Sequence, residues 1–239
     1  MVCDRPESRN AITDALFTEL IRQLESIAAD SSVRAVVVTG ANGTFSAGGD
    51  FETIGDLGRT SEQQVAENLA RTMCAAERLW ALPQPTIAAV DGAAVGAGMA
   101  LALACDIRVA SPGAILLPSF IRMGLLPDTG ASWLLPRLIG AGPALQMLLA
   151  GRPVGAEHAQ KMGLVAQVTA DPLQTALELA ALLTRQPAAA AATKRLLRAA
   201  AETDLATAID LEAVEQAAAF HRGEFAATFD AWRTTRVAD

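Results

Sequence analysis

The hydrophobic positions of this chain change their spacing along its length, and each spacing predicts a different element. Between residues 14 and 28, apolar side chains recur every three or four positions, as on one face of an α-helix. The segments 34–39 and 86–90 are short and rich in β-branched or small apolar residues, which is typical of buried strands. Helical spacing returns between residues 61 and 82. The order strand, helix, strand predicts parallel pairing with a right-handed crossover.

The middle of the chain continues this alternation. Small residues from 93 to 104 predict a closely packed buried helix, and segments 106–110 and 114–117 have strand-like patterns. From Asp128 onward the pattern is mostly helical, with one short strand expected at 165–168. The fold class is therefore α/β.

The composition changes near residue 170, where alanine-rich helices begin. Alanine has the highest helix propensity, so these runs predict helices rather than disordered low-complexity sequence. We expect two regions: a core over residues 1–170 and a helical C-terminal region over 171–239, whose exposed apolar positions would suit an oligomer interface.

Composition and charge narrow the class of protein. The chain has 239 residues, 51% of them hydrophobic, so it can bury a large core. It contains neither an apolar run long enough to span a membrane nor a leader pattern at its start, so we expect no membrane partner and a cytoplasmic location. The formal net charge of −7 argues against nucleic acid and favours a small-molecule ligand. The three cysteines lack metal or disulfide spacing.

Two glycine-rich turns are the first candidates for chemistry. Residues 45–50, Phe-Ser-Ala-Gly-Gly-Asp, lie between a predicted strand and a predicted helix, and residues 96–98, Gly-Ala-Gly, follow a strand. Glycine allows the backbone to approach a ligand closely, and a helix N-terminus carries unpaired N–H groups. Either turn alone is also explained as a simple tight turn. Together they can form an oxyanion hole.

Four motifs in the expected order resemble the crotonase superfamily, the enoyl-CoA hydratase/isomerase family. They are Asp4–Ala11, Phe45–Asp50, Asp91–Gly98 and Ala104–Ile107, and the resemblance extends over essentially the whole chain. It implies a β-β-α spiral core, a C-terminal trimerisation region, and a homotrimer or a hexamer of paired trimers. Members usually have a further strand before the first motif, so the pairing of a first strand is left open.

The resemblance also implies the ligand and its site. The substrate is an acyl-CoA thioester, with coenzyme A as part of the substrate and no separate cofactor or metal. The N–H groups that match Ala47 and Ala97 hold the thioester carbonyl. The residues expected to contact substrate are Ala47, Gly48, Gly49, Asp50, Gly96, Ala97, Phe120 and Trp133.

The resemblance narrows the reaction through two missing carboxylates and one extra carboxylate. Hydratases of the family use two glutamates, and the matching positions here are Ala100 and Phe120, which cannot exchange protons. Asp128 stands where hydratases usually have glycine. The segment around it resembles the Δ3,Δ2-enoyl-CoA isomerases and the ring-enoyl isomerase of phenylacetate breakdown, which place one acidic residue there. We therefore expect an enoyl-CoA isomerase in which Asp128 moves the proton.

Several interpretations of these residues remain open from the sequence alone. From its spacing, Asp128 is also a plausible helix cap, and Asp50 and Asp106 are best explained as structural residues. His158 and His221 fit solvated helix faces. Competing functions are a hydratase-like or other crotonase reaction, a non-catalytic acyl-CoA-binding protein, and a dehalogenase of the 4-chlorobenzoyl-CoA type, which would need a histidine before the strand at 86–90.

Overall fold

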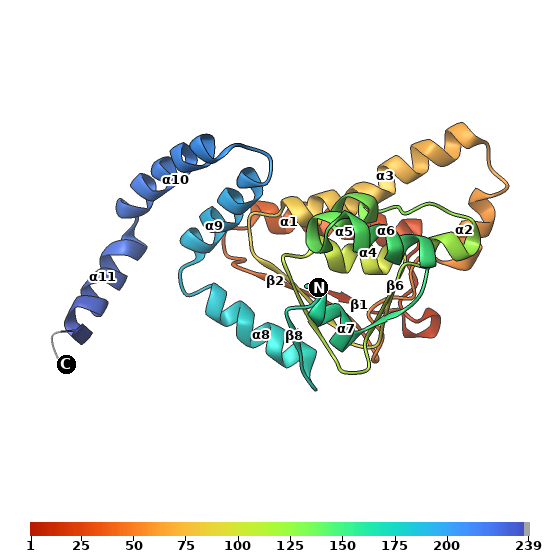
Figure 1. The fold of residues 1–239 in the computed structure, drawn as a ribbon, viewed down its shortest axis with the longest axis horizontal. Helices are drawn as coiled ribbons and strands as arrows, with labels where there is room; N and C mark the ends of the chain where they lie inside the picture. The colour runs from red at the N-terminus through yellow and green to blue at the C-terminus, as the bar shows by residue number, and fades with distance from the viewer. Residues whose placement is uncertain (237–239) are drawn as a thin grey trace.

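The computed structural model describes residues 1–236, and a five-stranded parallel sheet forms its centre (Figure 1). The strands lie in the order β1, β2, β3, β5, β8, and every pair in this sheet is parallel. A smaller sheet contains β4, β6 and β7, in which β4 and β6 are parallel and β7 is antiparallel to β6. The strand bounds are β1 (Val2–Cys3), β2 (Val36–Gly40), β3 (Thr86–Val90), β4 (Ala93–Val95), β5 (Ile107–Ala110), β6 (Ile115–Leu117), β7 (Val154–Gly155) and β8 (Gln167–Val168).

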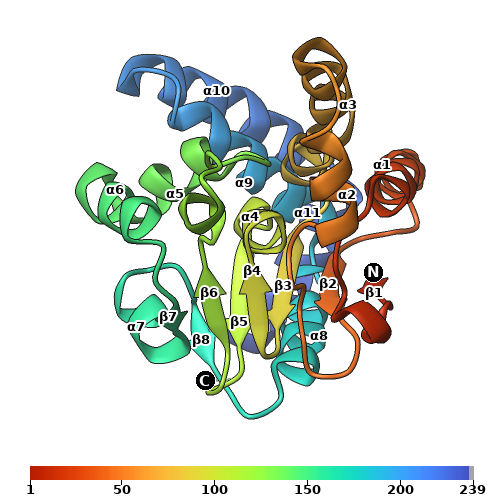
Figure 2. The same cartoon turned by 90° about the vertical axis from the view of Figure 1, so that its right-hand side faces the viewer.

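Helices surround these sheets, with α3, α4 and α5 near one end of the strands and α7 and α8 near the other end in Figure 2. Short 3-10 helices cover Pro6–Ser8 (η1) and Phe120–Met123 (η2). The helix bounds are α1 (Asp14–Ala29), α2 (Phe51–Leu57), α3 (Glu62–Ala81), α4 (Ala97–Ala104), α5 (Ala131–Ile139), α6 (Ala141–Ala150), α7 (Ala156–Lys161), α8 (Pro172–Leu183), α9 (Pro187–Ala200), α10 (Leu205–Phe220) and α11 (Gly223–Arg236). No helix within residues 1–236 is long and apolar enough to cross a membrane.

The predicted α/β class is confirmed, and one predicted element is wrong in part. Residues 93–104 were expected to form a single helix, but Ala93–Val95 form β4 and the helix begins only at Ala97. The backbone of β4 pairs with Ile115–Leu117, which satisfies its polar groups in a sheet. Gly96 then reverses the chain with a φ of 50°, a conformation that side chains disfavour.

The strand that the sequence left open is present as β1. Val2 pairs with Thr39, and Cys3 pairs with Gly40, both in parallel register. The chain thus adds a short edge strand beside β2 directly before the first motif.

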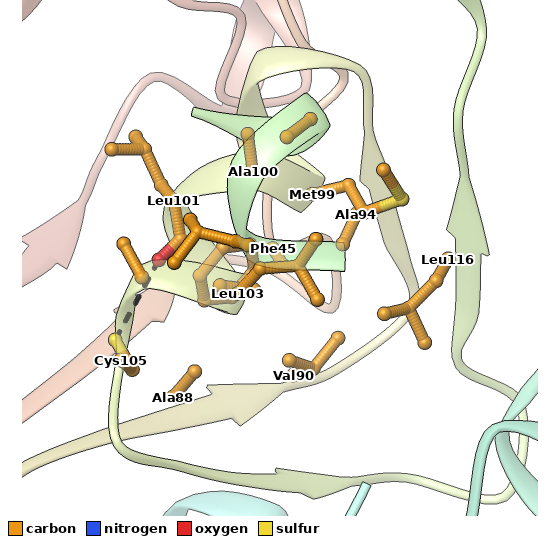
Figure 3. Close-up of a cluster of buried hydrophobic side chains, with 14 of the residues drawn as sticks. Phe45, Ala88, Val90, Ala94, Met99, Ala100, Leu101, Leu103, Cys105 and Leu116 are labelled. Atoms are coloured by element: carbon orange, nitrogen blue, oxygen red, sulfur yellow. Dashed lines mark hydrogen bonds between the residues drawn. The ribbon is translucent and has the colours of Figure 1, made fainter. Parts of the chain in front are cut away.

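Helix α4 is the centre of the hydrophobic core. All its residues are buried, and Figure 3 shows Met99, Ala100, Leu101 and Leu103 packed among side chains from neighbouring strands. The Cys105 thiol lies 3.7 Å from the carbonyl oxygen of Leu101, and burial raises the pKa of this thiol to about 12. Cys105 is therefore a protonated core residue at neutral pH.

Asp106 ties the C-terminal helices to the end of the sheet. Its carboxylate accepts hydrogen bonds from the backbone and side chain of Thr86, and it pairs with Lys194 at 2.6 Å and Arg198 at 2.7 Å. Both cationic residues belong to α9. The structural role expected of Asp106 agrees with these contacts.

Beyond α9, helices α10 and α11 extend away from the body of the molecule (Figure 1). None of the residues of α10 is buried, although large apolar side chains are exposed on it. The boundary predicted near residue 170 stays a prediction, and residues 237–239 of the predicted helical region lie outside the described residues.

Candidate active site

The two glycine-rich turns lie side by side because their backbones are hydrogen-bonded to each other. Ser46 N–H donates to the carbonyl of Ala93 at 2.9 Å, and Val95 N–H donates to the carbonyl of Ser46 at the same distance. A Cβ on Gly98 would lie only 2.5 Å from the Cβ of Ser46. Glycine at 98 therefore permits the close approach of the start of α4 to the first turn.

Within the first turn, four of the five N–H groups from Ser46 to Asp50 already have partners. Besides the bond of Ser46, Ala47 donates to the carbonyl of Arg9 at 2.9 Å, and Gly48 donates to the hydroxyl of Ser46 at 3.1 Å. Asp50 donates to the carbonyl of Ile12 at 3.0 Å. Among the described residues, none accepts a hydrogen bond from Gly49.

This arrangement corrects the first of the two predicted oxyanion donors. Ala47 was expected to hold the thioester oxygen, but its N–H is already bonded to Arg9 within the fold. Gly49, two residues further on, presents the unpaired N–H group of the turn. The sequence motif pointed to the correct loop, but it could not show which amide the fold leaves unpaired.

The second turn leaves the predicted donor available. Gly96 N–H donates to the carbonyl of Leu117 at 2.8 Å, whereas Ala97 N–H has no acceptor within the part of the chain that the structure describes. Ala97 is the first residue of α4, so its N–H belongs to the unpaired group at a helix N-terminus, where the helix dipole is positive.

Both unpaired amides open into the same cavity of about 390 Å³. Gly49, Ala97 and Asp128 all line this cavity, together with three other residues predicted to contact substrate, namely Asp50, Gly96 and Phe120. Ala47 and Gly48 do not line it. The remaining walls come from α1, α2, α3 and the segment after η2, through Ile12, Asp14, Phe17, Thr53, Ile54, Leu57, Gly58, Val65, Leu69, Thr72, Met73, Ser119, Met123, Leu125, Leu126, Pro127 and Thr129.

Asp128 is a half-buried carboxylate at the edge of this cavity. The hydroxyl of Thr129 donates a 2.9 Å hydrogen bond to its Oδ1. Burial raises the pKa of Asp128 above its ordinary value, and the bond from Thr129 opposes that shift in part. A carboxyl whose proton affinity is raised by burial in a cavity is suited to proton transfer.

The interpretation of Asp128 as a helix cap is contradicted by the geometry. The N-cap of α5 is Gly130, and no side chain caps this helix. Asp128 contributes its backbone carbonyl, which accepts from Ala131 at 2.8 Å, while its carboxylate receives no backbone N–H. Its side chain is therefore left for the cavity.

The other carboxylates of the cavity have structural partners. Oδ1 of Asp50 accepts from the N–H groups of Glu52 and Thr53 and caps α2, as expected. The carboxylate of Asp14 accepts a 2.7 Å hydrogen bond from the amide of Asn68.

The two positions that match the hydratase glutamates carry no acid. Ala100 is completely buried on α4 and lies in the core (Figure 3), whereas Phe120 presents its ring to the cavity. Within the described residues, Asp128 is thus the carboxylate of the cavity that is not used as a cap or bonded to an amide side chain.

Trp133 is not part of this cavity, contrary to its prediction as a substrate contact. Its ring packs edge-on against Trp80, with centroids 5.3 Å apart, and Arg137 stacks over it at 3.8 Å. Both tryptophans line separate surface hollows between α3, α5 and α9. Because the side chains of α5 point in several directions, the proximity of Trp133 to Asp128 in the sequence did not place its ring in the same cavity.

The histidines and metal-binding residue types lie outside this site. His158 and His221 are exposed on or next to helices, as expected. No three His, Cys, Asp or Glu side chains within the described part of the chain are grouped so that they could hold a metal ion.

Comparison with known proteins agrees with this geometry. The sequence model of the family described as "Enoyl-CoA hydratase/isomerase" matches residues 1–238. The chain belongs to this family. The structure is also similar to that of an enoyl-CoA hydratase from Polaromonas sp. JS666, with a TM-score of 0.93 and 30% identity over 98% of this chain and 92% of the other.

Related sequences of this enoyl-CoA hydratase/isomerase family carry names for different reactions. A 1,2-epoxyphenylacetyl-CoA isomerase of Escherichia coli (strain K12) is 35% identical over 223 residues, which are 89% of this chain and 82% of the relative. A 2,3-dehydroadipyl-CoA hydratase of the same strain is 37% identical over 212 residues, 86% and 80% of the two chains. The predicted superfamily and fold are therefore confirmed, and this family member is an enzyme acting on acyl-CoA.

Proposed function

We propose that this enzyme moves the double bond of an enoyl-CoA thioester, with Asp128 as its single acid and base. The observation that carries the proposal is the placement of the Asp128 carboxylate in one cavity with the unpaired N–H groups of Gly49 and Ala97. A proton-transfer group and an oxyanion hole are the two parts that an enolate reaction needs.

The proposed reaction begins with a β,γ-unsaturated thioester. Asp128, ionised, takes a proton from the α-carbon, and the electrons of the C–H bond form a dienolate whose negative charge rests largely on the thioester oxygen. The N–H groups of Gly49 and Ala97 stabilise that oxygen more strongly than the neutral carbonyl. The protonated Asp128 then returns the proton to the γ-carbon, which gives the α,β-unsaturated product and restores the carboxylate.

Hydration is the second candidate reaction, and the relatives named as hydratases favour it. It needs groups that orient and activate water, and the two matching positions hold Ala100 and Phe120. Phe120 also gives this part of the cavity an apolar wall. These residues support migration over hydration.

A dehalogenase and a non-catalytic binding protein have less support. A dehalogenase would attack with Asp128 but would need a histidine before β3, and both histidines of the chain lie after it, at 158 and 221. A non-catalytic binding protein would not require the Asp128 carboxylate in the cavity. The Asp128→Asn variant distinguishes a binding protein from an isomerase, because only the isomerase loses activity with the carboxylate.

The testing experiment supplies 3-enoyl-CoA and 2-enoyl-CoA thioesters of several lengths to the wild-type enzyme and to Asp128→Asn. Double-bond migration and water addition are followed separately, and binding of a saturated acyl-CoA is measured in parallel. We expect wild-type migration, little hydration, and a loss of migration of at least about 10²-fold in Asp128→Asn with binding retained.

Different outcomes would separate the candidates. Hydration without migration would refute the isomerase proposal and favour a hydratase. Tight binding with neither reaction in the wild type would favour a binding protein or another enolate reaction. Equal migration by wild type and Asp128→Asn would remove Asp128 from the mechanism.

We also propose that the enzyme assembles as a homotrimer or as a hexamer of paired trimers. The support is the exposed apolar surface of α10, where Leu205, Ile209, Val214 and Phe220 are between 52% and 76% exposed. Sedimentation equilibrium gives the mass in solution, and a monomer at micromolar concentration would contradict the proposal. The predictions of a cytoplasmic location and of no separate cofactor remain predictions.

A further inference from the structure

The active-site cavity has walls of one electrical sign. The charged side chains among its described lining residues are Asp14, Asp50 and Asp128, and this lining contains no lysine, arginine or histidine. A cavity lined only by carboxylates has no group that could neutralise an additional anion.

The wall formed by α2 and α3 is aliphatic. Val65, Leu69 and Met73 recur every four residues along α3, so they share one face of that helix, and Ile54 and Leu57 face the cavity from α2. All five side chains are half-buried. Thr72 lies on the same side of α3, but its hydroxyl is bonded to the carbonyl of Asn68 at 3.0 Å.

From these two observations, we propose that the cavity selects acyl groups with an uncharged apolar end and rejects acyl groups that end in a carboxylate. This inference deepens the proposed function, because it rests on the same cavity and names the class of acyl group that it accepts. A terminal carboxylate would lose water against the aliphatic wall, would find no cation there, and would be repelled by Asp128 and Asp14.

A matched pair of ligands tests this selection without any reaction. Hexanoyl-CoA and the mono-CoA thioester of adipic acid have the same number of acyl carbons and the same coenzyme A moiety, and they differ in the terminal carboxylate. Both are saturated, so neither can undergo double-bond migration. We expect the wild-type enzyme to bind hexanoyl-CoA at least about 30-fold more tightly in calorimetric titrations.

Two variants locate the origin of the selection. Leu69→Arg places a cation in the aliphatic wall and is expected to reduce the preference for hexanoyl-CoA at least about tenfold, whereas Leu69→Met keeps the wall apolar and should keep the preference. Asp128→Asn removes one of the repelling charges and should reduce the preference by a smaller factor. Circular dichroism confirms that each variant is folded before binding is compared.

The outcomes separate this inference from the proposed function. Affinities within threefold of each other in the wild type would overturn the inference, as would an unchanged preference in folded Leu69→Arg. Selective binding of hexanoyl-CoA by an enzyme that fails to move double bonds would overturn the proposed reaction and leave the selection established. Failure to bind either thioester would overturn both.

Discussion

Thr129 donates a 2.9 Å hydrogen bond from its hydroxyl to Oδ1 of Asp128, the residue that precedes it in the chain. Thr129 itself is buried, and its φ of 50° lies in the left-handed region that β-branched residues rarely adopt. Such a conformation is kept only where the surrounding structure fixes it. It directs the hydroxyl back to the carboxylate that we propose as the base.

Replacing Thr129 by valine should therefore change the pH dependence of double-bond migration. Valine keeps the branched shape but removes the hydroxyl that lowers the pKa of Asp128, so that this pKa rises further. The base acts when ionised, so the ascending limb of the plot of log kcat/KM against pH should move to higher pH. Thr129→Ser, which keeps a hydroxyl, should leave the limb near its wild-type position. A limb that is identical in all three enzymes would show that another group controls the profile.

Asp128→Asn should stabilise the fold while it abolishes migration. The pKa of Asp128 is raised in the folded state, so the folded protein holds this proton more tightly than the unfolded chain does. Ionisation of Asp128 therefore costs stability, and this cost develops as the pH rises from the ordinary value of 3.8 through the raised folded value.

At neutral pH the asparagine variant avoids that cost. We expect a gain of about 1 kcal/mol in the free energy of unfolding, or roughly 2–4 °C in Tm, measured by thermal unfolding across a pH series. The gain should shrink as the pH falls towards the ordinary pKa of aspartate. A lower Tm than wild type at pH 7 would contradict the assigned direction of the pKa shift.

Gly49→Pro should remove one oxyanion donor without removing an existing protein hydrogen bond. Because proline has no N–H, we expect kcat/KM for migration to fall by about 10²–10³-fold. Gly49→Ala is the matched control, since it keeps the N–H and brings a Cβ only to the flexible end of Ile54, at 3.0 Å. Equal losses in two folded variants would show that the side chain, and not the amide, causes the effect.

Gly98→Ala should destabilise the protein by separating the two glycine-rich turns. The added Cβ would lie 2.5 Å from the Cβ of Ser46, so that either α4 or the first turn must move. We expect a cost of about 1–3 kcal/mol in urea unfolding, together with reduced activity. Gly142→Ala, whose Cβ meets no atom within 4 Å, should stay within about 0.5 kcal/mol of wild type. Similar stabilities for the two variants would contradict the close contact.

The amino-acid sequence by itself determined much of this protein. Local spacing predicted the strand at 86–90 with its observed bounds and the long helix after Ser61, because apolar periodicity reflects which side of an element is buried. The order of the motifs identified the family, and the residues at 100 and 120 already showed that two hydratase carboxylates are missing.

Only the tertiary structure decided which groups meet and which remain unpaired. The sequence placed an oxyanion donor at Ala47, but the fold bonds that amide to Arg9 and leaves Gly49 free. It grouped Trp133 with the substrate contacts, but the fold packs that ring against Trp80. The physical reason is that hydrogen-bond partners and side-chain directions depend on segments far apart in the chain, whereas a sequence pattern records only local periodicity and residue type.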